Sequence, residues 1–177
     1  MKNEIRITFN SKRKIGIIII FLLFSLLGLF FIFQSNILIT IWIIKNKLFI
    51  QFLGLITFLL STIFLALFVN MYSRKTALIL DSEGIIDTSS PIRNTRRIRW
   101  QNIVDIQKLE LSGSTFILVF VDNPQQYINE ENKLSKWINK NNYKFYRTPI
   151  SISVVSLNTY VDTLEKQLKE NWKKYKI

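Results

Sequence analysis

The side chains of this chain that could take part in chemistry are carboxylates, amines, phenols and hydroxyls, because the sequence contains neither His nor Cys. Without His there is no imidazole base, no Ser-His or Cys-His nucleophile and none of the usual zinc sites. Without Cys there is no disulfide, thiolate chemistry or cysteine lipidation. The sequence therefore does not show whether the protein works in an oxidising or a reducing compartment. We therefore expect no catalytic residue, no cofactor and no metal site, and the protein is predicted not to be an enzyme.

One short segment does gather three carboxylates, those of Asp81, Glu83 and Asp87. Paired carboxylates can hold a cation or act as an acid and a base. Asp and Glu beside a Gly are also common turn formers, and we expect that role here. Only five Gly occur in the chain, and none of them belongs to a phosphate-binding loop motif.

The densest local charge is a run of arginines between positions 93 and 99. The candidate ligands for lipid head groups are Arg93, Arg96, Arg97 and Arg99. If residues 96 to 99 form a strand, Arg97 and Arg99 face one side and Arg96 the other, which weakens a single converging pocket. The preferred interpretation is a basic surface without head-group selectivity that is either solvated or faces the inner leaflet, where each charge is worth about 1 kcal/mol near anionic lipid.

Two long uncharged segments must position these groups. Residues 15–33 and 48–72 contain no Asp, Glu, Lys or Arg, and a helix of 19 residues is about 28 Å long, close to the hydrocarbon thickness of a bilayer. A buried core helix is the alternative for each segment, but two in succession argue against it. A cleaved signal peptide is the alternative for the first, but the apolar run is long and no small-x-small cleavage site follows it.

Basic residues near the ends of these segments predict their orientation, because Lys and Arg resist translocation. The proposed topology determinants are Lys12, Arg13, Lys14, Arg74 and Lys75. Only Lys45 and Lys47 lie in the connection, whose apolar stretch 37–44 is expected in the membrane interface. The sequence therefore predicts a multi-pass protein of the bacterial inner (cytoplasmic) membrane with both termini in the cytoplasm.

No ionisable side chain of the apolar segments could serve as a proton relay or ion ligand deep in the membrane, which argues against a pump or transporter. Gly54, Thr57 and Ser61 share one helical face, and Ser25 and Gly28 are neighbours on the other segment. Such small residues let helices approach closely. We expect packing within one chain, with oligomerisation as the alternative.

Residues 73–177 alternate short apolar runs with turn signals, as antiparallel β domains do. The expected strands are 76–81, 84–87, 96–100, 103–111, 115–121 and 149–156, with 115–121 as the central one. Residues 4–9 also alternate and could add a strand from the segment 1–14. The predicted domains are thus the N-terminal segment 1–14, a transmembrane hairpin 15–72 and a cytoplasmic domain 73–177.

Two helices are expected in this domain. The first starts at Asn123-Pro124 and runs to about residue 141, with a core-facing side formed by Tyr127, Ile128, Leu134, Trp137 and Ile138. The second is capped by Asn158, and its core-facing side consists of Tyr160, Val161, Leu164, Leu168 and Trp172. The expected fold class is α+β, with a transmembrane hairpin and a small antiparallel β domain, a partly open barrel or two packed sheets, closed by the last helix.

Several short motifs follow each other in a familiar order after the two apolar segments. They are LILDSEGIID, then IRWQNIVDI with a Trp-x-x-Ile-x-x-Ile spacing, then Asp122-Asn123-Pro124, then TPISI before the last helix. In this order the chain resembles a family of small bacterial membrane proteins of uncharacterised function, with two N-terminal spans and a C-terminal pleckstrin-homology-like (PH-like) domain. In that fold the loops of the early strands hold phosphoinositide head groups in lipid-binding members, so the resemblance implies the same place as the arginine run. For Trp100, Ile103 and Ile106 we expect core packing.

The function predicted from these features is a non-enzymatic, membrane-tethered PH-like interaction module at the inner leaflet. Its expected partners are the bilayer with its anionic lipids and a protein that the sequence does not identify. Nucleic acid is not expected, because membrane topology accounts for much of the net charge of +12. A small membrane enzyme, a transport accessory subunit and an immunity or stress-response protein stay open as alternatives.

Overall fold

The computed structural model describes residues 4–41, 45–92, 96–111, 113–129 and 132–176. The chain divides into two compact units, of which one contains Lys12–Tyr72 and the other contains Met1–Ser11 with Ser73–Ile177. We call the first the helical hairpin and the second the α+β unit. The α+β unit is discontinuous in sequence, because its N-terminal segment is separated from the rest by the whole hairpin.

The helical hairpin consists of α1 (Ser11–Phe33), the short α2 (Ser35–Ile41) and α3 (Lys47–Ser73). The long helices have 23 and 27 residues, which corresponds to about 35 and 40 Å. Only 11% of the most apolar 18-residue stretch of each is buried, whereas the core helix of a soluble protein is mostly buried. The hairpin therefore has two helices that are long and apolar enough to cross a membrane.

Small residues bring α1 and α3 together. A Cβ atom added at Gly28 would lie 2.6 Å from the backbone nitrogen of Phe58, and one added at Gly54 would lie 2.8 Å from the carbonyl oxygen of Gly28. The hydroxyls of Ser25 and Thr62 lie 3.1 Å apart across the same contact. The predicted close approach within one chain is confirmed, and it depends on the absence of side chains at both glycines.

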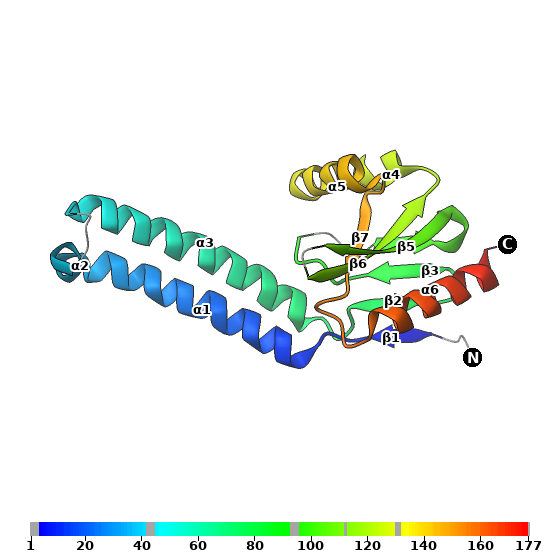
Figure 1. The fold of residues 1–177 in the computed structure, drawn as a ribbon, viewed down its shortest axis with the longest axis horizontal. Helices are drawn as coiled ribbons and strands as arrows, with labels where there is room; N and C mark the ends of the chain where they lie inside the picture. Colours follow the sequence, from blue (N-terminus) through cyan, green and yellow to red (C-terminus); the bar gives the residue numbers. More distant parts are fainter. Residues whose placement is uncertain (1–3, 42–44, 93–95, 112, 130–131, 177) are drawn as a thin grey trace. The chain divides into compact units, whose positions relative to one another are not determined.

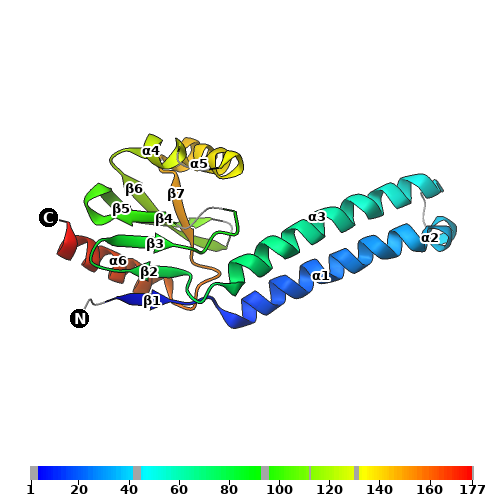
Figure 2. The same cartoon turned by 180° about the vertical axis from the view of Figure 1, so that it is seen from behind.

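The α+β unit contains two antiparallel sheets (Figures 1 and 2). The four-stranded sheet has the order β1 (Ile5–Ile7), β2 (Leu78–Leu80), β3 (Gly84–Asp87) and β4 (Arg96–Arg99). The three-stranded sheet has the order β5 (Ile103–Leu111), β6 (Ser114–Val121) and β7 (Ile150–Ser153). The predicted β2–β3 hairpin and the central position of β6 are confirmed. The alternating N-terminal segment pairs through β1 with β2, with Ile5 opposite Leu80.

The Trp-x-x-Ile-x-x-Ile spacing is explained by a β-bulge. Trp100, in the short 3₁₀ helix Trp100–Asn102, and Ile103 and Ile106 of β5 are each 1% exposed. A regular strand would place Ile103 and Ile106 on opposite faces, but the pairing with β6 shifts register between Ile103 and Asp105. The shift leaves Val104 exposed and returns Ile106 to the core, so the predicted packing role is confirmed.

The last helix, α6 (Val161–Tyr175), packs against β5 and the short 3₁₀ helix. Leu164 and Leu168 are fully buried, as predicted. The predicted helix start at Asn158 is wrong, because the backbone N–H of Asn158 donates to the carbonyl oxygen of Thr8 and this segment pairs with the N-terminal chain. The N-cap therefore lies two residues later, at Tyr160, which is exposed and not part of the core.

The predicted single helix from 123 to about 141 is also wrong. The structure has α4 (Pro124–Asn129) and a separate α5 (Lys133–Tyr146). The side chain of Asn132 accepts a hydrogen bond from the backbone N–H of Ser135 and thereby begins the second helix. Tyr127 and Ile128 of α4 are buried as predicted, whereas Leu134 and Trp137 of α5 are exposed and Ile138 is half-buried.

Candidate functional site

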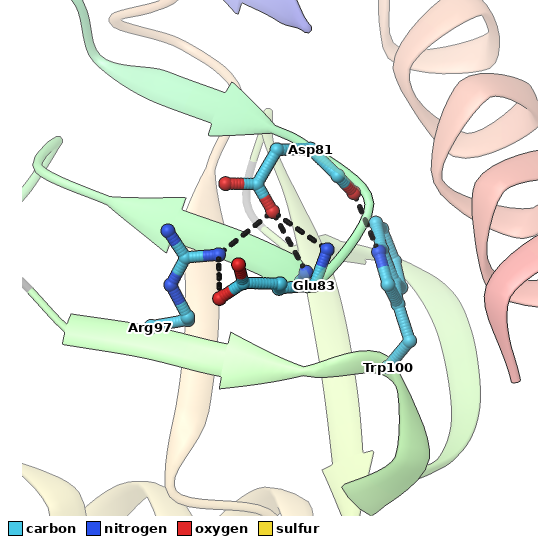
Figure 3. A network of polar contacts seen from close by, with 5 residues as sticks. Asp81, Glu83, Arg97 and Trp100 are labelled. Atoms are coloured by element: carbon cyan, nitrogen blue, oxygen red, sulfur yellow. Dashed lines mark hydrogen bonds and ion pairs between the residues drawn. The ribbon is translucent and has the colours of Figure 1, made fainter. Parts of the chain in front are cut away.

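The turn between β2 and β3 is shaped by Asp81 (Figure 3). Its Oδ1 accepts hydrogen bonds from the backbone N–H groups of Glu83, at 2.8 Å, and Gly84, at 3.0 Å. An Asp side chain that bonds the backbone two and three residues later stabilises a turn. Asp81 therefore has the turn-forming role expected of it.

Arg97 on β4 reaches the same turn (Figure 3). Its Nη1 lies 2.8 Å from Oδ1 of Asp81 and 3.1 Å from Oε2 of Glu83. The indole N–H of buried Trp100 donates to the backbone carbonyl of Asp81 at 2.8 Å. Because charge-assisted bonds hold Arg97 on two carboxylates, this arginine joins the turn to β4.

The same contacts set the ionisation of Asp81, whose side chain is 16% exposed. Burial alone would raise its pKa, but the hydrogen bonds from Glu83, Arg97 and Gly84 outweigh burial and lower the pKa of Asp81 below its usual value. The carboxylate is thus ionised at neutral pH and is unsuited to act as a general acid there.

The remaining arginines of the cluster are placed differently. Arg99, two positions after Arg97 on β4, is exposed. Arg96 begins β4, and its side chain is not among those described. Arg93 lies outside the described residues. Among the described side chains of the cluster, Arg97 is engaged in the turn and Arg99 is presented to solvent.

The third carboxylate of the predicted cluster, Asp87, is at the other end of β3. Its Oδ1 accepts hydrogen bonds from the backbone N–H of Ser89, at 2.9 Å, and from the Ser89 hydroxyl, at 2.6 Å. Within the described ranges no three His, Cys, Asp or Glu side chains come together in a group that could hold a metal ion. The three carboxylates therefore serve two separate turns.

Lys14 and Arg74, which are among the predicted topology determinants, also make structural contacts. Within the helical hairpin, Nζ of Lys14 donates to the carbonyl oxygen of Tyr72 at 2.9 Å. Within the α+β unit, Arg74 donates to the carbonyl oxygen of Thr88 at 3.0 Å. Lys12, Arg13 and Lys75 are exposed.

A surface that sequence reasoning missed lies on α5, at the outside of the α+β unit next to α4 and β7 (Figures 1 and 2). Leu134, Trp137 and Phe145 are 52%, 63% and 71% exposed. We call these three side chains the α5 apolar face. The spacing of Leu134 and Trp137 reveals an apolar side of the helix, but the prediction that this side faces the core is wrong.

The side of α5 that is buried is polar. Ser135 and Asn139 are fully buried, and they donate to the carbonyl oxygens of Ile92 and Tyr127, each at 3.2 Å. The amide of Asn142 donates to the Ser151 hydroxyl at 3.0 Å. Hydrogen bonds thus attach α5 to the unit by one side and leave the apolar face toward solvent.

A hollow of about 350 Å³ in the α+β unit lies beside the start of α6. It is lined by Asn10, Leu157, Asn158, Thr159, Tyr160 and Thr163. This lining supplies amides and hydroxyls but no carboxylate or amine, so it offers no pair of groups for acid and base catalysis at neutral pH.

Comparison with known proteins gave no protein-family model, no curated protein and no solved structure that matches this chain. The function is therefore proposed from the geometry and the sequence themselves.

The Asp81 contacts lead to a prediction about acid stability. We expect Asp81→Asn to lower the free energy of unfolding of the α+β unit by about 1 to 3 kcal/mol at neutral pH, because Arg97 loses its nearest ionised acceptor. Because folding lowers the pKa of Asp81, its stabilising contribution is complete above the unfolded value of about 3.9 and is lost as pH falls through the folded value. The wild-type chain should therefore lose more stability than the variant between about pH 5 and pH 2.

Urea unfolding of the full chain in detergent, followed by tryptophan emission at a series of pH values, measures this difference. The matched control is Glu83→Gln, because the side chain of Glu83 is 60% exposed and its contact with Arg97 is the longer one. Its effect should be below about 0.5 kcal/mol. Equal acid dependence in wild type and Asp81→Asn would show that the carboxylate contributes nothing through its charge.

Proposed function

We propose that this protein is a non-enzymatic, membrane-anchored module whose helical hairpin spans a bilayer and whose α+β unit binds anionic lipid head groups at that bilayer's surface. The observation that carries the proposal is the pair of long apolar helices, each with 11% of its most apolar stretch buried. Side chains such as Phe33 and Leu48, which are 74% and 76% exposed, would be costly in water and are favourable in hydrocarbon.

The proposed topology has both ends of the chain on one side, the cytoplasmic side of a bacterial inner membrane. Its support is the pairing of β1 with β2, because two strands that exchange backbone hydrogen bonds cannot have a bilayer between them. The basic residues at the start of α1 and just after the end of α3 favour the cytoplasm for that side.

The proposed fold of the α+β unit is PH-like. Its support is the combination of a four-stranded and a three-stranded antiparallel sheet with the closing helix α6 on β5. Of the candidate arginines for head groups, Arg97 is ion-paired with Asp81 and Glu83. We therefore assign the contact of β4 with head groups to Arg99. Arg93 and Arg96 stay candidates on sequence alone.

The proposal is non-enzymatic because of what the residues can do chemically. The sequence has no His or Cys, Asp81 is held ionised, and the hollow beside α6 has no acid and base pair. No observation favours an enzyme, a transport accessory subunit or an immunity or stress-response protein.

The test uses one reporter in the full chain, Lys166→Cys, at a side chain of α6 that is 76% exposed. Because the chain has no native Cys, only this position is labelled. In cells, a membrane-impermeant maleimide should react with it only after the membrane is opened, and the chain should stay in the membrane after an alkaline wash. Labelling of intact cells would overturn the orientation, and release by the wash would overturn the anchoring.

The second readout is energy transfer from a fluorophore at the same position to an acceptor lipid in nanodiscs. We expect higher transfer in anionic than in neutral discs, falling as salt screens the contacts. Arg99→Gln should lower the ratio of bound to free unit by about fivefold, the worth of one basic charge near an anionic surface. The control is Lys173→Gln, which removes a charge from an exposed side chain of α6. Equal transfer in neutral and anionic discs would overturn head-group binding and leave a protein as the partner.

A further inference from the structure

We infer that α5 is an interfacial helix whose apolar face inserts at the boundary between head groups and acyl chains of an anionic bilayer. This inference rests on the proposed function, since the hairpin would hold the α+β unit at the membrane. It adds a second and different contact to the one assigned to Arg99.

The α5 apolar face has the geometry of a membrane-contacting stripe. Trp137 follows Leu134 by three positions and Phe145 follows Trp137 by eight, so the three side chains fall along one side of the helix. Each is more than half exposed. Large aromatic side chains such as Trp and Phe are favoured where an amphipathic helix lies in a bilayer interface.

A small movement of α5 could not bury the α5 apolar face in the core. Burying it would require α5 to rotate, and rotation would break the bonds of Ser135 to Ile92, of Asn139 to Tyr127 and of Asn142 to Ser151. Two of these side chains are fully buried, so each lost bond would leave a polar group without its partner in the interior. The orientation of α5 is therefore held by its polar side.

The charges of α5 indicate which kind of surface covers the α5 apolar face. Four lysines and no acidic residue occur in the helix, and the lysines are Lys133, Lys136, Lys140 and Lys144. At 100° per residue they fall along one flank of the stripe, on the side away from Ser135 and Asn139. In sequence, Glu130 and Glu131 precede the helix, outside the described residues.

An anionic bilayer complements both parts of this surface, because it offers acyl chains to the stripe and phosphates to the lysine flank. A symmetric contact between two copies of α5 is disfavoured, since it would bring two all-basic flanks together. A tethered unit also meets the bilayer at high effective concentration, so three apolar side chains and four lysines suffice without a tight pocket.

The experiment places an environment-sensitive fluorophore at Asn141→Cys in the full chain. Asn141 lies one turn from Trp137 and one turn from Phe145, so the three side chains of the apolar face stay unchanged. In nanodiscs with one chain each, the label should shift to blue emission and become several-fold less accessible to aqueous iodide when the lipid is anionic. The same label at Lys166→Cys on α6 should stay accessible to iodide.

Two variants separate the contribution of the three apolar side chains from that of the four lysines. Replacing Leu134, Trp137 and Phe145 by Gln should return the label to water while the four lysines remain. Replacing the lysines by Gln should lower the ratio of inserted to free α5 by about fivefold for each charge removed. Both sets are exposed or half-buried, and the urea transition of the α+β unit confirms that the fold is kept.

The outcomes distinguish this inference from the proposed function. A water-exposed label in anionic discs overturns the inference, while salt-dependent energy transfer at Lys166→Cys would leave the proposed function standing. Equal burial of the label in neutral discs or in detergent shows that something other than anionic lipid covers the face, and overturns the inference. Burial that requires two chains per disc assigns the face to a second copy and also overturns it.

Discussion

Leu164→Asp should unfold the α+β unit while leaving the helical hairpin intact. Leu164 is fully buried where α6 packs against β5. Truncation of a buried Leu alone costs about 2 to 5 kcal/mol, and an unpaired carboxylate in the same place adds several more. Because the whole stability of a domain is about 5 to 15 kcal/mol, this one change should remove most or all of it.

The measurement is urea unfolding of the full chain in detergent, followed by the change in tryptophan emission, to which buried Trp100 and half-buried Trp172 contribute. Leu164→Ala should shift the transition to lower urea without abolishing it, because it removes apolar contacts but buries no charge. The matched control is Thr163→Asp, an exposed neighbour in the first turn of α6, where an acid is tolerated. A wild-type transition for Leu164→Asp would show that α6 does not close the core.

Gly28→Leu should force α1 and α3 apart. A Cβ at this position would lie 2.6 Å from the backbone nitrogen of Phe58, far inside van der Waals contact, and backbone cannot move aside as a side chain can. The helices would have to separate by more than an ångström, which removes the packing that holds two helices together in lipid.

The reporter is the pair Ser25→Cys and Thr62→Cys, because the two hydroxyls lie 3.1 Å apart in the structure. With no native Cys present, mild oxidation should join these two positions, and Gly28→Leu should slow the joining by at least about tenfold, the effect of roughly 1.4 kcal/mol. Gly16→Leu on the same helix is the control, since nothing lies within 4 Å of its added Cβ. Unchanged cross-linking with Gly28→Leu would mean that the helices do not meet at the glycines.

Head-group binding by all four candidate arginines is poorly tested by replacing them together. Replacing all four by Gln would also remove Arg97 from Asp81 and Glu83, so a loss of binding could reflect a disturbed turn. Arg99→Gln avoids this ambiguity, because Arg99 is exposed next to the turn and outside its ion pairs. A fragment that starts at residue 73 is likewise unsuitable, since it would lack the edge strand β1.

Features that depend on a local pattern of residues could be predicted from the amino-acid sequence. Long uncharged runs predict α1 and α3, alternation predicts β1 and most other strands, and the Asp81 to Gly84 segment predicts a turn. The spacing of Leu164 and Leu168 predicts the buried side of α6. Each of these follows from the interaction of a segment with water or with its own backbone, so neighbours distant in sequence are not needed to recognise it.

Which partner each helix or strand contacts could not be predicted in this way, because it depends on how the whole chain folds. Leu134 and Trp137 have the periodicity of a core face, yet the polar side of α5 is buried because Ile92 and Tyr127 present backbone carbonyls to Ser135 and Asn139. Arg97 differs from Arg99 because β4 pairs with β3 and brings one of them to Asp81. Periodicity shows that a helix has two unlike sides, but which side is buried depends on the hydrogen-bonding groups that the rest of the fold places against it.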